Sequence, residues 1–402
     1  MKQKRLLTLL GCIGVVLVLI ALCFAAACAK PAPPEAKTLK VGAVFAVTGP
    51  AAPTIKYNIE GAILAAEWIN EKGGITVNGQ QYLIEIVAED NKSSPDGAVA
   101  AANKLVYQDK VQFIIGPVTP QCAAAMTPIT EENKVLRCRV DGIGHPSEMN
   151  PDLRYTFTTY LNMNHVVPAY DYFVESYPQA KTVAMTGPDD PGGQAAVAAA
   201  EKEAKSRGFE VVFAELYPFG TEDFYPILTK ALDQKPDAID ITVGVTPWFA
   251  GIIKQARELG FTGPMFSACP TGDIYLLRDL VGRDFADEIF LIEPDLMSPE
   301  MPPILREIGK RVSEKYGMEV TYAHIGAWEA LWCMVQAIEE AQSLDTTVIA
   351  ETWEKMESID TLFGKARMGG LETWGINHVV MRPAPISRMV KGEVEFIKFV
   401  TP

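Results

Sequence analysis

Short apolar runs alternate along the chain with longer segments in which apolar residues recur every three or four positions. The run LKVGAVFAV, residues 39–47, is typical of a buried strand, and residues 54–74 have helical spacing that ends at Gly73-Gly74. Two further pairs of strand and helix follow, and the strand VLRCRV comes after them. This βαβαβα order predicts a parallel sheet covered by helices.

The same alternation starts again after a connection near Tyr160 and continues to residue 294. Apolar strands such as KTVAMTG, DAIDITVG and EIFLIEP are separated by segments of helical spacing. Two successive units of this kind predict an α/β fold with two doubly wound parallel-sheet lobes. Because open α/β sheets bind ligands at the carboxyl ends of their strands, we expect a ligand-binding cleft between the lobes.

Composition and charge exclude some partners. Apolar residues make up 48% of the 402 residues and charged residues 21%, as in an ordinary globular protein. The formal net charge of −14 argues against nucleic acid and anionic lipid as partners of the folded part. Any anion site must therefore be local.

The N-terminus resembles the signal of a bacterial lipoprotein. MKQKR is basic, an apolar stretch follows, and AAAC, residues 25–28, places small residues before a cysteine. We expect residues 1–27 to be a signal peptide, Cys28 to carry a lipid anchor to the membrane, and residues 28–37 to be a tether. Cleavage before Cys12 and an uncleaved spanning helix are the alternatives. Most of the chain would then lie on the periplasmic or extracellular face.

Four cysteines remain in the folded part, and an exported protein can oxidise them. Cys122 and Cys138 form the most plausible disulfide, since they lie at a helix start and in the following strand. Buried thiols are at least as good an interpretation.

One loop has the pattern of an anion site. The strand ending at Ile115 meets Gly116-Pro117, and a helical segment starts after Thr119. Backbone N–H groups at a helix start bind anions readily. A phosphate is disfavoured because the chain lacks a G-x-x-x-x-G-K-[ST] motif.

Four separated segments resemble those of a known family. They are LKVGAVFAVTGPAAPTIKYNIEGAILAAEWINEKGGI, VAEDNKSSPDGAVAAANKLVYQDKVQFIIGPV, FGTEDFYPILTKALDQKPDAIDI and IKQARELGFTGPMF. In this order they resemble the leucine/isoleucine/valine-binding protein family of ABC importers. The resemblance implies a type I periplasmic binding fold, a small ligand (an amino acid, carboxylate or amide), ABC permease subunits as partners, and no cofactor.

The resemblance also implies two lobes that are joined by three crossings and close around the ligand by hinge motion. The crossings are expected near residues 157–161, 291–296 and 358–364. Lobe one would comprise residues 38–158 and 295–360, and lobe two residues 159–294 and 361–402.

The resemblance assigns roles to two loops. In such proteins the loop that corresponds to Val118-Thr119-Pro120-Gln121 holds the ligand's carboxylate. An acidic residue of lobe two pairs with the ligand's ammonium group, and Thr271 stands at that position here. Asp273 could replace the acid or could cap the following helix. An unpaired buried ammonium group is costly, so the substitution disfavours a zwitterionic ligand.

Two other stretches depart from the family pattern. Arg139 stands where small hydroxyl residues are usual, and it could clamp a carboxylate or form a salt bridge on the lobe surface. Pro191-Gly192 replaces a Tyr-Gly pair, so Tyr160 or Trp248 could supply the aromatic lining. Packing in the core is an equal alternative for Trp248.

The three departures from the family pattern favour a carboxylate ligand without a free ammonium group, including aromatic or amide-bearing acids. The chain has no G-x-S-x-G or H-E-x-x-H motif, so we do not expect an enzyme. The alternative function is that of a ligand-sensing receptor component that signals through a separate membrane partner. The candidate ligand-binding residues are Thr48, Val118, Thr119, Gln121, Arg139, Tyr160, Thr246, Trp248 and Thr271.

Overall fold

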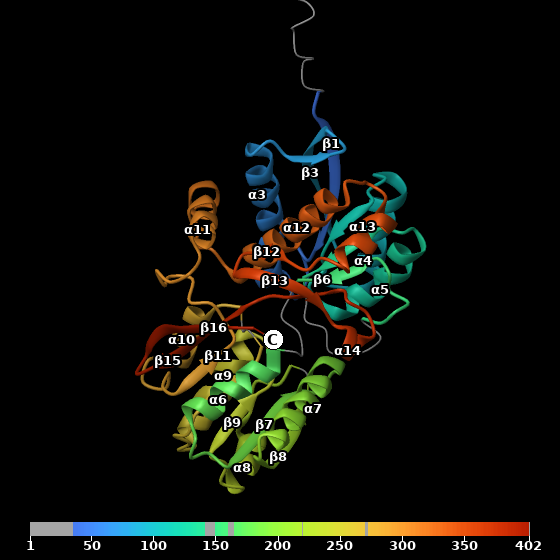
Figure 1. Ribbon diagram of the computed structural model, residues 1–402. Helices are drawn as coiled ribbons and strands as arrows, with labels where there is room; N and C mark the ends of the chain where they lie inside the picture. The colour runs from blue at the N-terminus through green and yellow to red at the C-terminus, as the bar shows by residue number, and fades with distance from the viewer. Residues whose placement is uncertain (1–34, 141–148, 160–164, 219, 270–271, 402) are drawn as a thin grey trace, which may run out of the picture. The chain divides into compact units, whose positions relative to one another are not determined.

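A computed structural model of the chain describes residues 35–140, 149–159, 165–218, 220–269 and 272–401. In those residues, no helix combines the length and the apolar character that are needed to cross a membrane. The described strands form two β-sheets, and each sheet with its helices makes one lobe (Figure 1).

The first sheet has nine strands in the order β12-β13-β14-β6-β5-β4-β1-β3-β2. Its strands are β1 (Lys37–Phe45), β2 (Ile75–Val77), β3 (Gln80–Asp90), β4 (Phe113–Ile115), β5 (Leu136–Arg139), β6 (Thr156–Thr158), β12 (Ile359–Thr361), β13 (Gly364–Gly369) and β14 (Val379–Met381). The pairs β1–β4, β4–β5 and β5–β6 are parallel. This central part of the sheet matches the predicted βαβ order.

Helices cover both faces of the first sheet. Val41, Ala43 and Phe45 of β1 pack in one core, and Val44 packs in another, because side chains alternate along a strand. The helix α12 lies beside α3 in the first core, and α4 lies beside α5 over the second (Figure 1). The helices of this lobe are α2 (Ala52–Ile55), α3 (Tyr57–Glu71), α4 (Pro95–Asn103), the π-helix η1 (Lys104–Gln108), α5 (Pro120–Glu132), α11 (Pro303–Tyr316), α12 (Tyr322–Ala341), α13 (Thr346–Trp353) and α14 (Leu371–Trp374).

The second sheet has seven strands in the order β16-β15-β11-β10-β9-β7-β8. Its strands are β7 (Thr182–Pro188), β8 (Glu210–Tyr217), β9 (Ala238–Ile241), β10 (Met265–Ser267), β11 (Ile289–Leu291), β15 (Ala384–Val390) and β16 (Glu393–Val400). Its helices are α6 (Val166–Ser176), α7 (Pro191–Ser206), α8 (Tyr225–Asp233), α9 (Thr246–Glu258) and α10 (Ile274–Val281). The antiparallel pair β15–β16 forms a hairpin near the C-terminus.

The chain passes between the two sheets at three crossings. The first crossing lies between β6 and α6, the second between β11 and α11, and the third at Arg382-Pro383 between β14 and β15. The predicted third crossing near residues 358–364 is wrong, and so is the assignment of residues 361–381 to lobe two. The strand β13 pairs with β14, and β14 pairs with β6 of the first sheet, so these residues belong to lobe one.

The two sheets share a central strand order, β3-β1-β4-β5-β6 in lobe one and β8-β7-β9-β10-β11 in lobe two. In each lobe the chain first adds a strand on one side of the starting strand and then continues on the other side. The resulting switch points lie between β1 and β4 and between β7 and β9. Open α/β sheets bind ligands beside such points, at the carboxyl ends of the strands.

The four cysteines in the described part of the chain do not form a disulfide. Cys122, Cys138 and Cys333 are buried, and Cys269 is half-buried. The expected Cys122–Cys138 bridge is therefore not present, and the alternative of buried thiols describes this pair.

Candidate ligand-binding site

The loop from β4 to α5 brings Val118, Thr119 and Gln121 to the switch point of lobe one. Thr119 is the N-cap residue of α5, with extended backbone angles, and its carbonyl oxygen accepts the Ala123 N–H at 3.0 Å. Its side chain does not cap the helix, and its buried hydroxyl oxygen has no hydrogen-bond partner among the described residues. Val118 is half-buried and Gln121 is exposed.

Gly116 lets this loop lie against β1. Its φ angle is +92°, and a Cβ atom built on it would lie 2.4 Å from the carbonyl oxygen of Val44. Both observations require glycine, since a side chain would be strained and would collide with backbone. The close approach holds the start of α5 beside the end of β1.

Thr48 follows β1 and is held by Asp90, the last residue of β3. The Thr48 hydroxyl donates to Asp90 Oδ2 at 2.6 Å, and the Val47 N–H donates to Oδ1 at 2.9 Å. Partial burial of Asp90 favours its neutral form, but hydrogen bonds from Thr48, Lys92 and Val47 outweigh burial and lower the pKa of the carboxyl. Because its proton is committed to Asp90, the Thr48 hydroxyl can offer a ligand only its acceptor lone pairs. Sequence reasoning missed Asp90, although it ends an apolar strand.

The two arginines of β5 are buried. Arg137 donates to the carbonyl oxygen of Ala123 at 3.0 Å and to the hydroxyl of Thr127 at 2.7 Å, so it fastens α5 to the sheet. Arg139, the last residue of β5, is 1% exposed. Arg139 is therefore not on the lobe surface, where the alternative interpretation placed it.

In lobe two, Thr246 and Trp248 lie in the first turn of α9, just after β9. Thr246 is buried, and Trp248 is half-buried against the core beneath α8, α9 and α10. The Trp248 ring meets Tyr217 edge to face at 6.0 Å between centroids. Core packing thus accounts for at least part of Trp248, as the alternative interpretation expected.

Asp273 is occupied by a structural role. It is the N-cap residue of α10, and its Oδ1 accepts the N–H groups of Tyr275 at 3.0 Å and Leu276 at 2.9 Å. The capping interpretation of Asp273 is confirmed. Tyr160, Thr271 and Cys28 lie outside the described residues.

Sequence reasoning also missed two buried acids of lobe two. The Tyr275 hydroxyl on α10 donates to Asp295 Oδ1 in the second crossing at 2.6 Å. Asp240 lies within β9, where burial raises the pKa of its carboxyl to about 7 despite a 2.8 Å hydrogen bond from the Tyr170 hydroxyl. Each acid follows or interrupts an apolar run, which is a weak signal.

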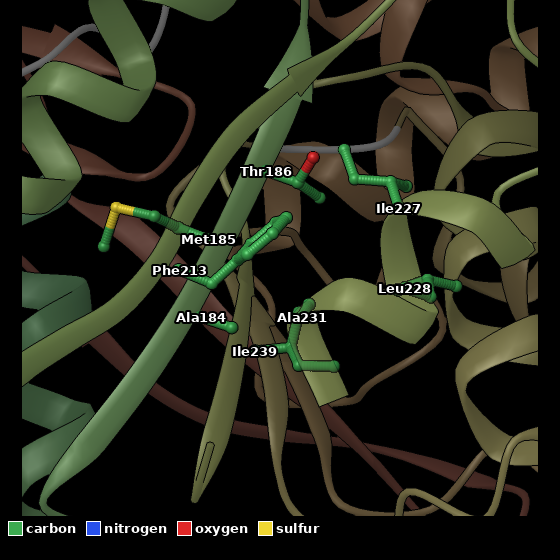
Figure 2. A pocket seen from close by; sticks show the side chains of 8 residues that line it. All are labelled: Ala184, Met185, Thr186, Phe213, Ile227, Leu228, Ala231 and Ile239. Atoms are coloured by element: carbon green, nitrogen blue, oxygen red, sulfur yellow. The ribbon is translucent and has the colours of Figure 1, made fainter. Parts of the chain in front are cut away.

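Two hollows in the described part of the chain are not lined by any candidate ligand-binding residue. An apolar void of about 10 Å³ lies between β7, β8, β9 and α8, and it has room for one water molecule and not for an amino acid. Figure 2 shows the side chains that line this void. A larger hollow of about 220 Å³ lies between α13 and the segment before β6, and Arg154, Tyr155 and Glu351 are among its lining residues. Tyr155 precedes β6, so this hollow is at the amino ends of the strands.

Two doubly wound lobes, linked by three crossings and carrying polar loops at their switch points, define a bilobed ligand-binding protein. The chain belongs to the periplasmic binding protein family, whose sequence pattern matches residues 38–393. This match confirms the family that the sequence resembles and the predicted fold class. The chain is accordingly a binding protein and not an enzyme.

The relatives are named for branched-chain amino acids. The Leu/Ile/Val-binding protein of Escherichia coli (strain K12) is 26% identical over 341 residues, covering 82% of this chain and 86% of that protein. The leucine-, isoleucine-, valine-, threonine- and alanine-binding protein of Pseudomonas aeruginosa is 29% identical over 240 residues. That match covers 57% of this chain and 61% of the Pseudomonas protein, less than two thirds of its length.

Solved structures show the same fold. A leucine-binding protein from Thermotoga maritima has a TM-score of 0.71 at 24% identity, with 90% of this chain and 99% of that chain covered. A solute-binding protein from R. palustris, solved in complex with benzoate, has a TM-score of 0.71 at 17% identity, with 91% and 97% covered. At these identities the likeness supports the fold alone.

Proposed function

We propose that this protein is the extracytoplasmic solute-binding subunit of an ABC importer of the branched-chain amino acid type. It captures a small carboxylate or amino-acid-like ligand between its lobes, which close by hinge motion and present the closed form to the permease. The family and the named relatives support the capture of an amino-acid-like ligand. The ligand's chemistry rests on one observation, the buried Thr119 hydroxyl without a partner among the described residues.

A carboxylate suits the position of Thr119 for two reasons. The first N–H groups of α5, a helix of 13 residues, have no partner within the helix and carry its positive end. The first turn of α5 contains no acidic residue that would compete for them. A ligand oxygen can therefore accept bonds from both the hydroxyl and the backbone, and the charge strengthens each bond.

In lobe two, the start of a second helix can contact the ligand when the lobes close. Val245 occupies the N-cap position of α9 and cannot cap it through its side chain, whereas Asp273 caps α10 and Asp190 caps α7. We therefore place Thr246 and the start of α9 against the ligand in the closed form. The start of α9 follows β9, at the switch point of this lobe.

The proposed ligand has a carboxylate and no free ammonium group. Asp273 is the acid nearest to Thr271 in the sequence. Its Oδ1 accepts two backbone hydrogen bonds at the start of α10, so it is a poor partner for an ammonium group. Thr271 itself would offer a neutral acceptor. The benzoate complex of the R. palustris protein is an example of such an acid bound in this fold.

We further propose that Cys28 carries a lipid and that residues 28–37 tether the lobes to the membrane. The small residues before Cys28 and the Pro/Ala-rich stretch after it support this anchor. Mass spectrometry of the protein made in a bacterial host tests it. A Cys28→Ser variant that keeps a lipid-bearing N-terminal peptide would contradict the assignment.

The ligand proposal is tested by thermal unfolding of the chain from Ala29 onward, refolded to remove any carried ligand. Leucine and its deaminated counterpart 4-methyl-2-oxopentanoate form a matched pair that differs at the ammonium group, and benzoate extends the series. A ligand that binds only the native state raises Tm, and the rise grows with the ratio of the ligand concentration to Kd. We expect the two acids to raise Tm and leucine to have little effect, so an equal shift with leucine contradicts this ligand class.

A Thr119→Val variant tests the site itself. Valine keeps the shape and removes the hydroxyl, so affinity for 4-methyl-2-oxopentanoate should fall about tenfold or more, as for a lost hydrogen bond to a charged group. Thr130→Val is the matched control, because Thr130 is buried on the same helix and bonds to the carbonyl oxygen of Met126. Equal affinity in the wild-type protein and Thr119→Val would place the ligand elsewhere.

A further inference from the structure

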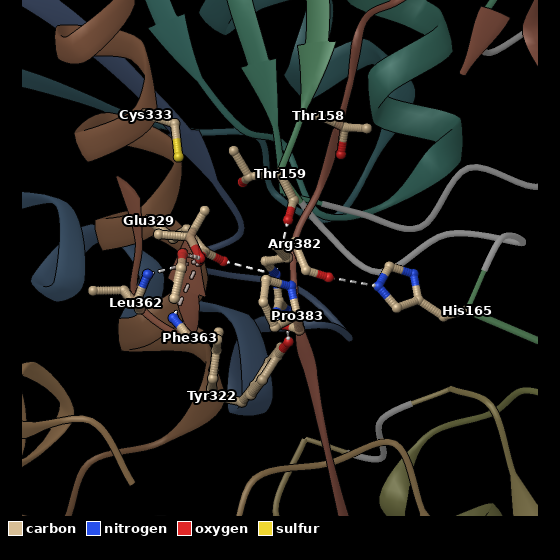
Figure 3. A network of polar contacts seen from close by, with 12 residues as sticks. Thr158, Thr159, His165, Tyr322, Glu329, Cys333, Leu362, Phe363, Arg382 and Pro383 are labelled. Carbon is tan, nitrogen blue, oxygen red and sulfur yellow. Dashed lines mark hydrogen bonds and ion pairs between the residues drawn. The ribbon is translucent and has the colours of Figure 1, made fainter. Parts of the chain in front are cut away.

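A buried arginine occupies the third crossing. Arg382 lies between β14 of lobe one and β15 of lobe two and is 1% exposed. Its guanidinium forms an ion pair with Glu329 of α12, with 2.9 Å between Nε and Oε2, and stacks 4.4 Å from the Phe363 ring centroid. Figure 3 shows these groups converging on Arg382 from separate segments of the chain.

Arg382 also holds the first crossing from both sides. Its Nε donates to the carbonyl oxygen of Thr159, directly after β6, at 3.1 Å. Its own carbonyl oxygen lies 3.3 Å from Nε2 of His165, which directly precedes α6 (Figure 3). The first and third crossings are therefore bonded to each other through one residue.

The same guanidinium fastens these crossings to lobe one. Its Nη2 donates to the hydroxyl of Tyr322, the first residue of α12, at 2.5 Å. Glu329, seven residues further along α12, is itself held by the Leu362 N–H at 3.1 Å. Because α12 is the long buried helix of the first core, it is a rigid support for both crossings.

An ion pair in this position is not needed for packing. Replacing a buried ion pair by apolar residues of similar volume is often neutral or stabilising, because burial of both charges is costly. An arginine can nevertheless do what a methionine cannot. Its planar fork donates in several fixed directions at once and here reaches the Glu329 carboxylate, the Tyr322 hydroxyl and the backbone carbonyls of Thr159 and Pro383.

We propose that Arg382 is a positioning residue for ligand capture, which pins the first and third crossings to α12 and so sets the opening of the ligand-free lobes. This inference rests on the proposed function, since it concerns the hinge motion that closes the lobes. With both crossings fixed on lobe one, the pivot lies on the lobe-two side of Arg382. Loss of the guanidinium frees both segments and lets the lobes sample wider angles.

The test measures the distance between spin labels on the two lobes by pulsed electron resonance. Exposed positions on α5 and α7 accept the labels through Ala124→Cys and Lys202→Cys in the chain from Ala29 onward. The variants are Arg382→Met, Arg382→Lys and the double variant Arg382→Met/Glu329→Met, which removes both charges. Arg137→Met is the matched control, since Arg137 is equally buried and its bonds to Ala123, Thr127 and Thr156 all lie within lobe one.

We expect the ligand-free distance distribution to be broader and longer in all three Arg382 variants than in the wild-type protein, and unchanged in Arg137→Met. Because apparent affinity scales with the population that can close, affinity for 4-methyl-2-oxopentanoate should fall about tenfold in the double variant. If Arg382→Met does not fold, the distances and the affinity are measured on the double variant instead. A folded double variant with the wild-type distances overturns the proposal, and so does an equal broadening in Arg137→Met.

The ligand-free distances separate this inference from the proposed function. If leucine, 4-methyl-2-oxopentanoate and benzoate all leave the distance in the wild-type protein unchanged, the proposed closure around these ligands fails. The ligand-free distances of the wild-type protein and the variants still test the role of Arg382. If the ligand closes the wild-type lobes and Arg382→Lys behaves like the wild-type protein, a single positive charge suffices and the guanidinium geometry is not what fixes the crossings.

Discussion

The two lobes share one strand order, but an acidic residue on a strand of each lobe has different surroundings and a different carboxyl pKa. In lobe one, Asp90 ends β3, accepts backbone and hydroxyl hydrogen bonds, and has a lowered carboxyl pKa. In lobe two, Asp240 lies inside β9, is fully enclosed, and has a carboxyl pKa raised to about 7. The two carboxyl pKa values shift in opposite directions because hydrogen bonds from the Thr48 hydroxyl and from the Val47, Thr48 and Lys92 N–H groups outweigh burial at Asp90, whereas burial dominates at Asp240.

One helix start from each lobe shows a second contrast. The N-cap side chain of α10, Asp273, is bonded to its own helix, whereas that of α5, Thr119, is not. A bonded cap closes a helix start, and an unbonded one leaves its N–H groups to a ligand. The start of α5 therefore suits an anion better than the start of α10 does.

The largest expected effect separates two glycines, one from each lobe. Gly116→Ala should lower the free energy of unfolding by about 3 kcal/mol, because the left-handed backbone and the collision with the Val44 carbonyl both cost energy. Gly208→Ala in lobe two has a similar φ of +81° but no described atom within 4 Å, so it should cost only about 1 kcal/mol. Urea unfolding measures both values. Equal costs would show that the start of α5 is not pressed against β1.

A second prediction concerns the pH dependence of Asp240. Its pKa in the folded protein is about 7, above the usual 3.8, so the folded state binds the extra proton and the contribution of Asp240 to the free energy of unfolding should fall as pH rises from about 4 to 7. Asp240→Asn removes this fall. The free energy of unfolding of the variant minus that of the wild-type protein should be about 2 kcal/mol larger at pH 8 than at pH 5, as measured by urea unfolding.

The contribution of Asp90 to the free energy of unfolding should change with pH in the opposite direction. Its lowered carboxyl pKa gives stability that is present above the unfolded value and is lost as pH falls through the folded value. Asp90→Asn should therefore reduce stability at pH 7 and have less effect at pH 3. A parallel response of the Asp90 and Asp240 variants would contradict the contrast between strand end and strand interior.

The smallest effects compare the two helix starts. Asp273→Ala removes a bonded cap and should cost about 1 kcal/mol of unfolding free energy without changing ligand affinity. Thr119→Val removes an unbonded side chain and should change stability by less than about 0.5 kcal/mol while it weakens the ligand. Urea unfolding and titration with 4-methyl-2-oxopentanoate measure both quantities. A destabilised Thr119→Val would indicate that the hydroxyl caps α5.

The periodic pattern by itself determined most strands and helices, the two doubly wound units and the loop at Thr119. These features are local: a strand or a buried helix face repeats over a few residues, and parallel strands place the loops that follow them at one edge. The capping role of Asp273 was visible for the same reason, since a cap needs only the residues next to it.

Only the tertiary structure decided what depends on partners that are distant in sequence. β14 joined lobe one because it pairs with β6, and the sequence of a strand of three residues does not determine which strands lie beside it. Asp90 became the holder of Thr48 across 42 residues, and Arg382 became the junction of Thr159 and Glu329. An acid or an arginine in a sequence has many possible partners, and only the packed fold selects among them.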